Sequence, residues 1–216
     1  MVTCLILVAT LGFDADLVLR RIREIRSPKR LICFALKVDE QNFKRVESAF
    51  ELIRFISEKM GFPSELKPFT AESGLIRSIK VELERLAFQD DVELNLTGGP
   101  RILIVASLIA ALLLPENIAK GIYVRIAGER FEAELKTRLT ILKALTSLDN
   151  DEREILELIT EKEQATVTEI AKDINIPKST VYKKVRKIAE KSLVELINRH
   201  TGEKYTVSRE LLDLLY

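Results

Sequence analysis

The stretch VELNLTGGPRILIVASLIAALLL, residues 92–114, decides the fold of the N-terminal part of this chain. It opens with a short apolar run, Val92–Leu96, passes through Thr97–Arg101, and continues as the longer apolar run Ile102–Leu114. Paired glycines followed by a proline are typical of a turn that leads from a strand into a helix. The helix would end before Pro115, short of the roughly 20 apolar residues that cross a bilayer. We therefore predict a strand, a loop and a buried helix that also packs against a partner subunit.

Strand and helix patterns alternate on both sides of this unit. Further apolar runs predict strands at Cys4–Ala9, Leu31–Val38, Glu65–Phe69 and Ile122–Ile126. Pro68 favours an edge position for the third of these strands. Apolar residues at helical spacing predict helices over Asp14–Ile25, Phe43–Gly61 and Leu75–Leu86. Such alternation implies an α/β, Rossmann-like, doubly wound and mainly parallel sheet. Residues 131–135 either add a short last strand or already begin a helix.

A different pattern follows from Lys136. We expect a connecting helix over Lys136–Leu148 and then three helices and a hairpin, at Glu152–Glu163, Thr168–Ile174, Lys178–Lys191, and Leu193–Ile197 with Lys204–Val207. This order predicts a winged helix-turn-helix. The expected domains are therefore residues 1–135 for ligand sensing and dimerisation, 136–148 as the connector, and 149–216 for DNA binding.

The corner of the helix-turn-helix has the residue types that it needs. Asn175 tolerates a left-handed conformation, Pro177 cannot continue the second helix, and Ser179 or its neighbour can cap the third. The third helix would bury Val181 and Val185, which lie on one face. Ser192, before the first wing strand, stands where related modules often have glycine.

Positive charge concentrates on the third helix of this module. Residues 178–191 hold six Lys and Arg and one Glu, although the net charge of the chain is only +1. Such a local excess suits contact with DNA phosphates, and residues near the helix start would reach base edges. The candidate DNA-binding residues are Lys178, Ser179, Thr180, Tyr182, Lys183, Lys184, Arg186 and Lys187 on the helix, with Arg199 and Lys204 on the hairpin. The alternative is a solvated helix in a protein-interaction module.

Two loops at the carboxyl ends of strands predict a ligand site, because doubly wound sheets bind ligands there. They are Thr10–Asp14 and Asn95–Arg101. In the second loop, free backbone N–H groups at the glycines, the start of a helix, the Thr97 hydroxyl and the Arg101 guanidinium together suit an anion such as phosphate. The loop matches neither a dinucleotide nor a Walker pattern, so we expect no NAD or ATP cofactor. The alternative is a plain glycine turn, with Asp14 as a helix cap and Phe13 in the core.

Composition excludes several other classes. His200 is the one histidine of the chain, and we place it on the hairpin, which argues against a metal site and against a Ser-His-Asp or Cys-His catalyst. Cys4 and Cys33 lie in apolar runs that predict buried strands, and we expect two buried thiols in a reducing cytosol; the alternative, if those strands are neighbours, is a disulfide. No secretory signal pattern is present, so a cytoplasmic protein without membrane association is expected.

The chain resembles the CRISPR-associated transcription regulators of archaea that are associated with type I-A systems. The resemblance rests on the segments Ala9–Phe13 and Asn95–Arg101, in a Rossmann-like module that is followed by a winged helix-turn-helix. These proteins join a CARF domain (CRISPR-associated Rossmann fold) to a DNA-binding module. The resemblance implies a homodimer that binds double-stranded DNA and holds a cyclic oligoadenylate, typically the tetra-adenylate, across its twofold axis. The ligand-binding residues would be Thr10, Gly12, Phe13, Thr97, Gly98, Gly99, Pro100 and Arg101.

Two other functions remain open from the sequence. One is a ring nuclease that cleaves the cyclic ligand, although Asn95 replaces the acidic residue expected at that position. The other is a DNA-binding scaffold whose first domain only dimerises. We expect a regulator with no enzyme activity, in which a ligand changes DNA affinity by favouring one arrangement of the dimer.

Overall fold

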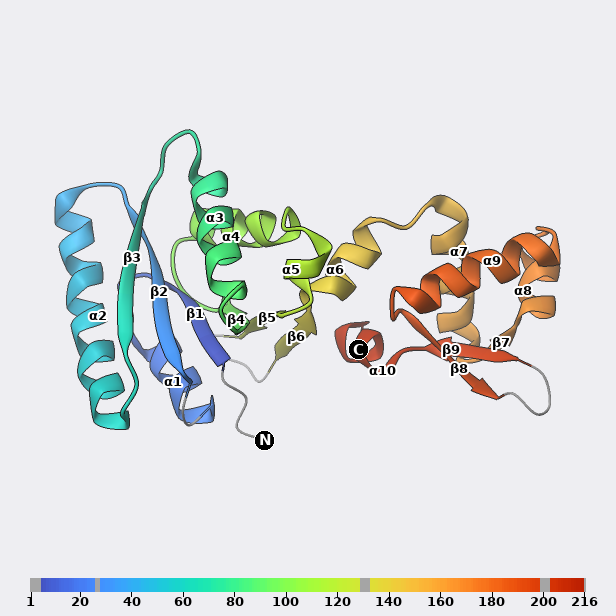
Figure 1. The fold of residues 1–216 in the computed structure, drawn as a ribbon, viewed down its shortest axis with the longest axis horizontal. Helices are drawn as coiled ribbons and strands as arrows, with labels where there is room; N and C mark the ends of the chain where they lie inside the picture. Colours follow the sequence, from blue (N-terminus) through green and yellow to red (C-terminus); the bar gives the residue numbers. More distant parts are fainter. Residues whose placement is uncertain (1–4, 26–27, 129–132, 199–202, 216) are drawn as a thin grey trace. The chain divides into compact units, whose positions relative to one another are not determined.

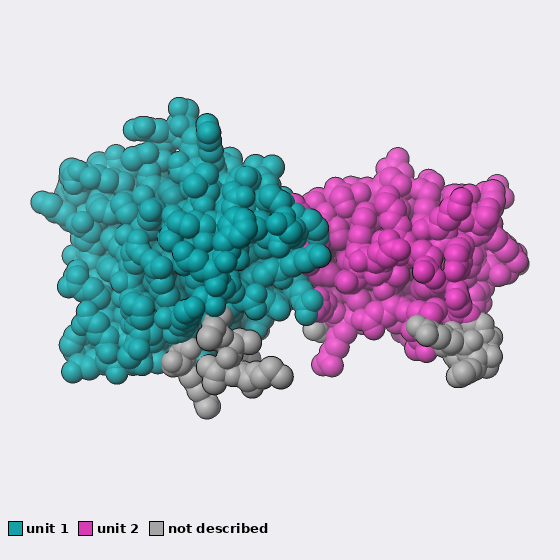
Figure 2. Space-filling model, in the orientation of Figure 1, with its two compact units in different colours: residues 1–139 teal, residues 140–216 magenta. Residues whose placement is uncertain are grey.

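The computed structural model describes residues 5–25, 28–128, 133–198 and 203–215. The chain divides into two compact units, residues 1–139 and 140–216, which Figure 2 colours separately. Cys4, Arg199 and His200, for which the sequence made predictions, lie outside the described residues. Within the described ranges, every helix is too short or too polar to cross a bilayer.

The first unit is a six-stranded sheet flanked by helices, in the strand order β3-β2-β1-β4-β5-β6 (Figure 1). The strands are β1 (Leu5–Leu11), β2 (Arg30–Lys37), β3 (Ser64–Thr70), β4 (Asp91–Asn95), β5 (Ile122–Ala127) and β6 (Glu134–Arg138). The helices are α1 (Asp16–Ile25), α2 (Glu40–Met60), α3 (Leu75–Ala87), α4 (Arg101–Leu112) and α5 (Glu116–Ala119). β1 to β5 are parallel and β6 is antiparallel to β5. The predicted Rossmann-like fold is confirmed.

Local sequence explains why the elements end where they do. Asp39 caps α2 by accepting a hydrogen bond from the backbone N–H of Asn42, and Gly61 ends the helix in the left-handed conformation with φ 84°. β3, which contains Pro68, lies at the edge of the sheet as predicted. α1 and α2 share one apolar core with β1 and β2, whereas α3 and α4 pack against each other.

A network of buried charges fastens α1 to the sheet. The Arg21 guanidinium donates to both carboxylate oxygens of Glu93, at 2.6 and 2.5 Å, and to Glu24 at 2.9 Å. Arg125 on β5 donates to Glu24 at 3.0 Å and to Glu134 on β6 at 2.7 Å. Because Glu93 is buried within β4, its charge is tolerated only in the presence of this paired guanidinium.

The second unit is a winged helix-turn-helix. Its elements are α6 (Leu139–Thr146), α7 (Asn150–Lys162), β7 (Ala165–Thr166), α8 (Val167–Asp173), α9 (Lys178–Glu190), β8 (Val194–Asn198), β9 (Lys204–Val207) and α10 (Arg209–Leu215). The strands form a small sheet in the order β7-β9-β8. The predicted helix-turn-helix followed by a hairpin is therefore confirmed (Figure 1).

The corner residues follow the predictions with one exception. Asn175 adopts a φ of 53°, and Val181 and Val185 are fully buried, as expected. The predicted cap at Ser179 is wrong, because α9 starts after Pro177 without a side-chain cap. Ser192 adopts a φ of 60°, which explains why glycine suits this position.

The predicted connecting helix over residues 136–148 needs correction. Residues 136–138 belong to β6, where buried Thr137 lies between exposed Lys136 and Arg138, the two-residue alternation of an edge strand. The helix α6 begins at Leu139, and its Ile141 and Ala144 belong to the core of the second unit. The boundary between the units therefore falls after residue 139 rather than 135, and α6 packs into the core of the second unit rather than forming a free connector.

Replacing Glu93 by Gln should lower the free energy of unfolding of the first unit by about 3 kcal/mol, because the buried Arg21 loses its main counter-charge. Glu65→Gln is the matched control. It breaks the pair between Arg30 and Glu65, whose side chains are 30% and 42% exposed, and should cost less than about 1 kcal/mol. Urea unfolding of both variants measures the difference, and equal losses would contradict a structural role for the buried network.

Candidate functional site

The strand order reverses between β1 and β4, and the two predicted ligand loops meet at this point. β1 and β4 are parallel neighbours, with Ala9 opposite Asn95. The loop after each strand therefore emerges at the same edge of the sheet. This edge is where ligands bind in doubly wound folds, and the structure brings the two predicted loops together there, while the ligand site itself stays a prediction.

The glycines of these loops allow the loops to touch each other. Gly99 has a φ of 95°, and a Cβ atom there would lie 3.2 Å from the backbone N of Leu11 and 3.2 Å from the carbonyl carbon of Thr10. A Cβ atom on Gly12 would lie 3.2 Å from the Cα of Gly99. The sequence predicts that the glycines let the backbone approach a ligand closely. In the structure they let the two loops approach each other.

The two threonines hold the loops in place. The buried Thr10 hydroxyl donates to the carbonyl oxygen of Gly98. The Thr97 hydroxyl donates to the Asn95 side-chain oxygen at 2.5 Å and accepts from the backbone N–H of Ala127 at 3.1 Å. The structure thus places both hydroxyl groups inside the protein, where they position the loops. It also gives Asn95 a role that the sequence did not reveal, as the acceptor at the centre of this turn.

Backbone N–H groups remain open on the second loop. Among the described residues, nothing accepts a hydrogen bond from the N–H of Gly98, Gly99, Arg101 or Ile102. These groups lie at the N-terminal end of α4, where the helix dipole favours negative charge. Pro100 is the residue that caps this helix, one position before its first turn. The loop therefore has the donors that an anion requires.

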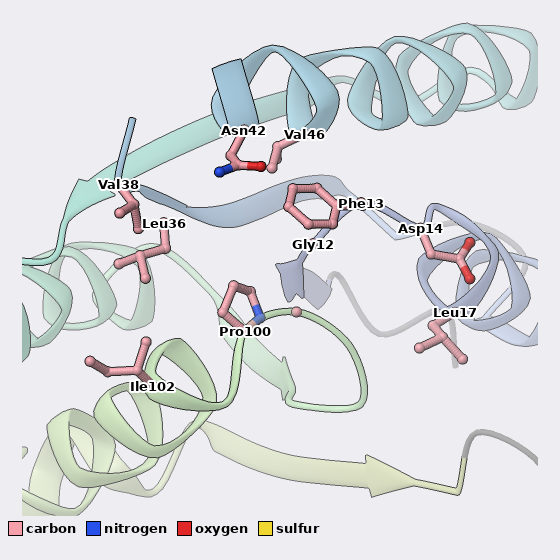
Figure 3. Close-up of a pocket in the computed structure, with 11 residues that line it drawn as sticks. Gly12, Phe13, Asp14, Leu17, Leu36, Val38, Asn42, Val46, Pro100 and Ile102 are labelled. Atoms are coloured by element: carbon pink, nitrogen blue, oxygen red, sulfur yellow. The ribbon is translucent and has the colours of Figure 1, made fainter. Parts of the chain in front are cut away.

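A cavity of about 690 Å³ opens beside these loops at the ends of β1 and β2 (Figure 3). Its lining is Gly12, Phe13, Asp14, Leu17, Leu36, Val38, Asn42, Val46, Gly99, Pro100 and Ile102. Asp14 accepts a hydrogen bond at 2.8 Å from the N–H of Asp16, the first residue of α1, as a side chain at a helix start does, and it also lines the cavity. The alternative that Phe13 lies in the core is wrong, because its side chain is 52% exposed and forms part of the cavity wall.

The residues contributed by α2 were missed by sequence reasoning. Asn42 and Val46 line the cavity, and the Arg45 guanidinium lies 4.0 Å from the centre of the Phe13 ring. These residues follow β2 in the chain, at a turn without the glycines that marked the other two loops. The stacking of Arg45 on Phe13 joins two segments far apart in sequence, and no local pattern signals it.

A second, largely apolar groove of about 840 Å³ lies between α3 and α4, and Arg101 lines this groove rather than the first cavity. Ile102 and Val105 are each 55% exposed on α4, and Ile109 and Leu113 continue the stripe. Within the single chain this face of α4 is therefore exposed, whereas the opposite face, with Leu103 and Ala110, is buried. The predicted packing of the helix against a partner subunit stays a prediction. Ile102 belongs to both hollows, so the apolar stripe starts at the edge of the first cavity.

On α9 the predicted DNA-binding residues divide between two faces. Ser179, Tyr182, Lys183 and Arg186 lie together on the exposed face. Arg186 donates to the Tyr182 hydroxyl at 3.3 Å and lies 5.8 Å from its ring centre. Lys178 and Lys204 are also exposed, whereas Thr180 is half-buried.

The other lysines of α9 contact the start of α7. Lys184 pairs with Asp149 at 2.9 Å and Asp151 at 3.0 Å, and Lys187 pairs with Glu152 at 2.5 Å. Burial by itself would raise the pKa of Glu152, but the hydrogen bond from Lys187 and the capping hydrogen bond at Asp149 hold this pKa below its usual value. Lys184 and Lys187 therefore stabilise the helix packing, and the single cationic face predicted from the sequence is divided.

The described part of the chain contains no group of three or more His, Cys, Asp or Glu side chains that could hold a metal ion. Cys33 is buried in β2, and burial raises the pKa of its thiol far above the usual value.

Comparisons with known proteins match each unit to a family model. The model described as Csa3 CRISPR-associated Rossmann-like domain matches residues 5–138. The model described as TrmB, sugar-specific transcriptional regulator, matches residues 145–209. No curated protein is significantly similar to the chain.

Two solved structures resemble parts of the chain. Reduced HlyU from Vibrio cholerae N16961 is 17% identical, with 36% of this chain and 78% of that protein covered and a TM-score of 0.31. The protein VC1899 from Vibrio cholerae is 11% identical, with 97% of this chain covered and a TM-score of 0.45. This chain spans 63% of the length of VC1899.

Gly99→Ala should destabilise the first unit more than Gly61→Ala does. Both positions have positive φ, which costs an alanine about 1–2 kcal/mol, but a Cβ atom on Gly61 meets nothing within 4 Å. The Gly99 variant must also separate the two loops, which adds about 1–3 kcal/mol. Urea unfolding checks the order, and an equal loss in both variants would show that the loops do not press on each other.

Proposed function

We propose that a cyclic oligoadenylate controls this protein, which belongs to the Csa3 family of CRISPR-associated Rossmann-like proteins. The chain also carries a TrmB-like winged helix, and the two units together make it a CRISPR-associated transcription regulator. One observation carries this proposal. Open backbone N–H groups at the start of α4 border a cavity with an aromatic and apolar wall. This combination suits a ligand that has both phosphates and flat bases.

Two arginines next to the cavity, although outside its wall, support an anionic ligand. Arg101 and Arg45 are exposed, and the ion pairs of the described residues leave both guanidinium groups without a carboxylate partner. Asp14 is the one ionisable side chain in the cavity wall, and it is held by its capping hydrogen bond. Phosphates would therefore lie towards the loop 98–102, and the bases would lie against Phe13 and the apolar side of the cavity.

We propose that the protein is a homodimer and that the exposed apolar stripe of α4 forms the interface between the two copies. A twofold contact buries the same surface from both copies, so one apolar stripe can cover its own counterpart. Ile102 and Val105 lie in the N-terminal half of α4, beside the cavity. A contact centred there would place the two anion loops near the twofold axis, as a ring-shaped ligand shared by two chains requires.

We further propose that the ligand is bound without being cleaved. Cleavage of an RNA ring needs a group that activates the 2′-hydroxyl or stabilises the leaving oxygen. The protons of the Thr10 and Thr97 hydroxyl groups are already donated within the protein. The remaining polar lining, Asn42 and Asp14, has no histidine or lysine beside it in the cavity wall.

Calorimetric titration of the protein with cyclic tetra-adenylate should give one ring bound per two chains. Ile109→Glu, which introduces a charge into the α4 stripe, should produce a monomer with at least about tenfold weaker binding, because each chain would hold only half of the site. Sedimentation and calorimetry measure the two effects together.

Leu52→Glu is the matched control, since Leu52 is an exposed apolar residue of α2 outside the cavity wall. This variant should remain dimeric and bind the ring as the unaltered protein does. Absence of ring binding in the unaltered protein would leave the scaffold alternative, and linear products after incubation would establish the ring nuclease.

The proposed DNA contact is the exposed face of α9. Ser179 and Tyr182 lie near its N-terminal end, where side chains of a recognition helix reach base edges, and Lys183 and Arg186 extend towards the phosphates. The lysines that pair with α7 contribute less, because binding to a phosphate would require them to leave a carboxylate.

Lys183→Ala combined with Arg186→Ala should weaken binding to random-sequence duplex DNA and flatten the slope of log affinity against log salt by about two, one for each lost phosphate contact. Lys184→Ala should change this slope by less than about one half. Fluorescence anisotropy over a salt series measures both. A larger effect from Lys184 would mean that its ion pairs with Asp149 and Asp151 open on DNA.

A further inference from the structure

We propose that Asn42, Phe13 and Arg45 form a base-reading subsite in the cavity, which accepts a nucleobase with an exocyclic amino group and rejects one with a carbonyl group at that position. The proposal rests on the proposed function, because it assumes that the cavity holds the bases of a cyclic oligonucleotide. It goes further in naming the residues that select the base, none of which belongs to the anion loop 98–102.

The direction of the Asn42 amide is fixed by Asp39. The Asp39 carboxylate accepts from the backbone N–H of Asn42 at 2.7 Å and from its Nδ2 at 2.7 Å. These hydrogen bonds hold the pKa of Asp39 below its usual value, so at neutral pH the carboxylate only accepts. Nδ2 must therefore face Asp39, and Oδ1 must face away from it.

Asn42 lines the cavity, and no hydrogen bond from the described residues reaches its Oδ1. Figure 3 shows its oxygen on the side of Val46 and its nitrogen on the side of Val38, and both valines also line the cavity. An oxygen in this position can accept a hydrogen bond but cannot donate one. The amino group of adenine or cytosine would satisfy it, whereas the carbonyl of hypoxanthine, guanine or uracil would place two acceptors against each other.

Phe13 and Arg45 provide the platform for the base. The Phe13 ring forms part of the cavity wall, and Arg45, which lies outside the lining, covers the ring at 4.0 Å. The guanidinium holds the ring in place through a cation–π contact, and the side chain remains 52% exposed. A flat base can stack on such a surface. Leu36 and Val46 close the cavity with apolar groups. Asp14, the other polar side chain of the wall, already accepts the N–H of Asp16, so we assign the discrimination between bases to Asn42.

The test compares two rings that differ only at this edge of the base. Cyclic tetra-inosinate has the phosphates and sugars of cyclic tetra-adenylate, but each amino group is replaced by a carbonyl and the neighbouring N1 carries a proton. The unaltered protein should bind the inosinate ring at least about tenfold more weakly in calorimetry. Asn42→Leu, which removes the acceptor, should bind the two rings within about threefold of each other.

A second variant separates base reading from a structural effect. Asp39→Asn keeps a capping side chain but can both donate and accept, so it no longer fixes the Asn42 amide. This variant should keep its melting temperature within a few degrees and should lose discrimination between the rings. Gln41→Leu, a neighbouring change on α2 outside the cavity wall, should leave both binding and discrimination unchanged.

The outcomes distinguish the two levels of the proposal. Equal binding of both rings by the unaltered protein overturns the base-reading subsite and leaves ring sensing intact. Binding of neither ring overturns ring sensing and the subsite with it. Discrimination that persists in Asn42→Leu also overturns the role of Asn42, because another group must then read the base.

Discussion

The contact between the loops after β1 and β4 is the constraint on which the proposed site depends. Thr10 donates to Gly98 across this contact, and Gly99 lies so close to Leu11 that a side chain there would collide with backbone atoms. This contact sets the position of the first turn of α4, and hence the direction of its open N–H groups. It also fixes the end of β1 and, with it, the position of Phe13 in the cavity wall. The same packed pair of loops would thus position the proposed anion contact and the Phe13 side of the proposed base contact, whereas Asn42 and Arg45 are supplied by α2.

This loop pair is also connected to the start of the DNA-binding unit. Thr97 accepts a hydrogen bond from Ala127 at the end of β5, and Ala127 lies opposite Glu134 of β6. Arg125 pairs with Glu134 at the same place, and β6 runs into α6 without an intervening residue. A ligand that shifts the Thr97 turn would therefore act on β6 and on the first helix of the second unit. The coupling can only be as large as the preference of the ligand for one position of this turn.

The sequence predicts the elements well and the contacts between them poorly. Apolar runs and helical spacing identify the parallel strands, α2 with its glycine end, and the helix-turn-helix corner at Asn175, because these depend on neighbouring residues. The sequence predicts a helix for residues 136–138, because the alternation of buried and exposed residues in β6 is too short to be recognised beside the longer apolar pattern of α6. Arg45 on Phe13 and Lys184 with Asp149 join distant segments. Such pairs depend on packing, which residue spacing along the chain does not encode.

The division of charge on α9 changes what its lysines can contribute. A count along the helix treats every cation as available to DNA, yet Lys184 and Lys187 neutralise the acidic first turn of α7. Glu152 is fully buried, so removing its partners would leave a charge without compensation. These lysines are therefore needed for the packing that orients α9. The exposed face keeps Lys178, Lys183, Arg186 and Tyr182, a smaller set in which Arg186 also contacts the aromatic ring. If α9 contacts DNA as proposed, fewer free cations would weaken its attraction to DNA of any sequence, and contacts that depend on the base sequence would have to supply a larger share of the binding free energy.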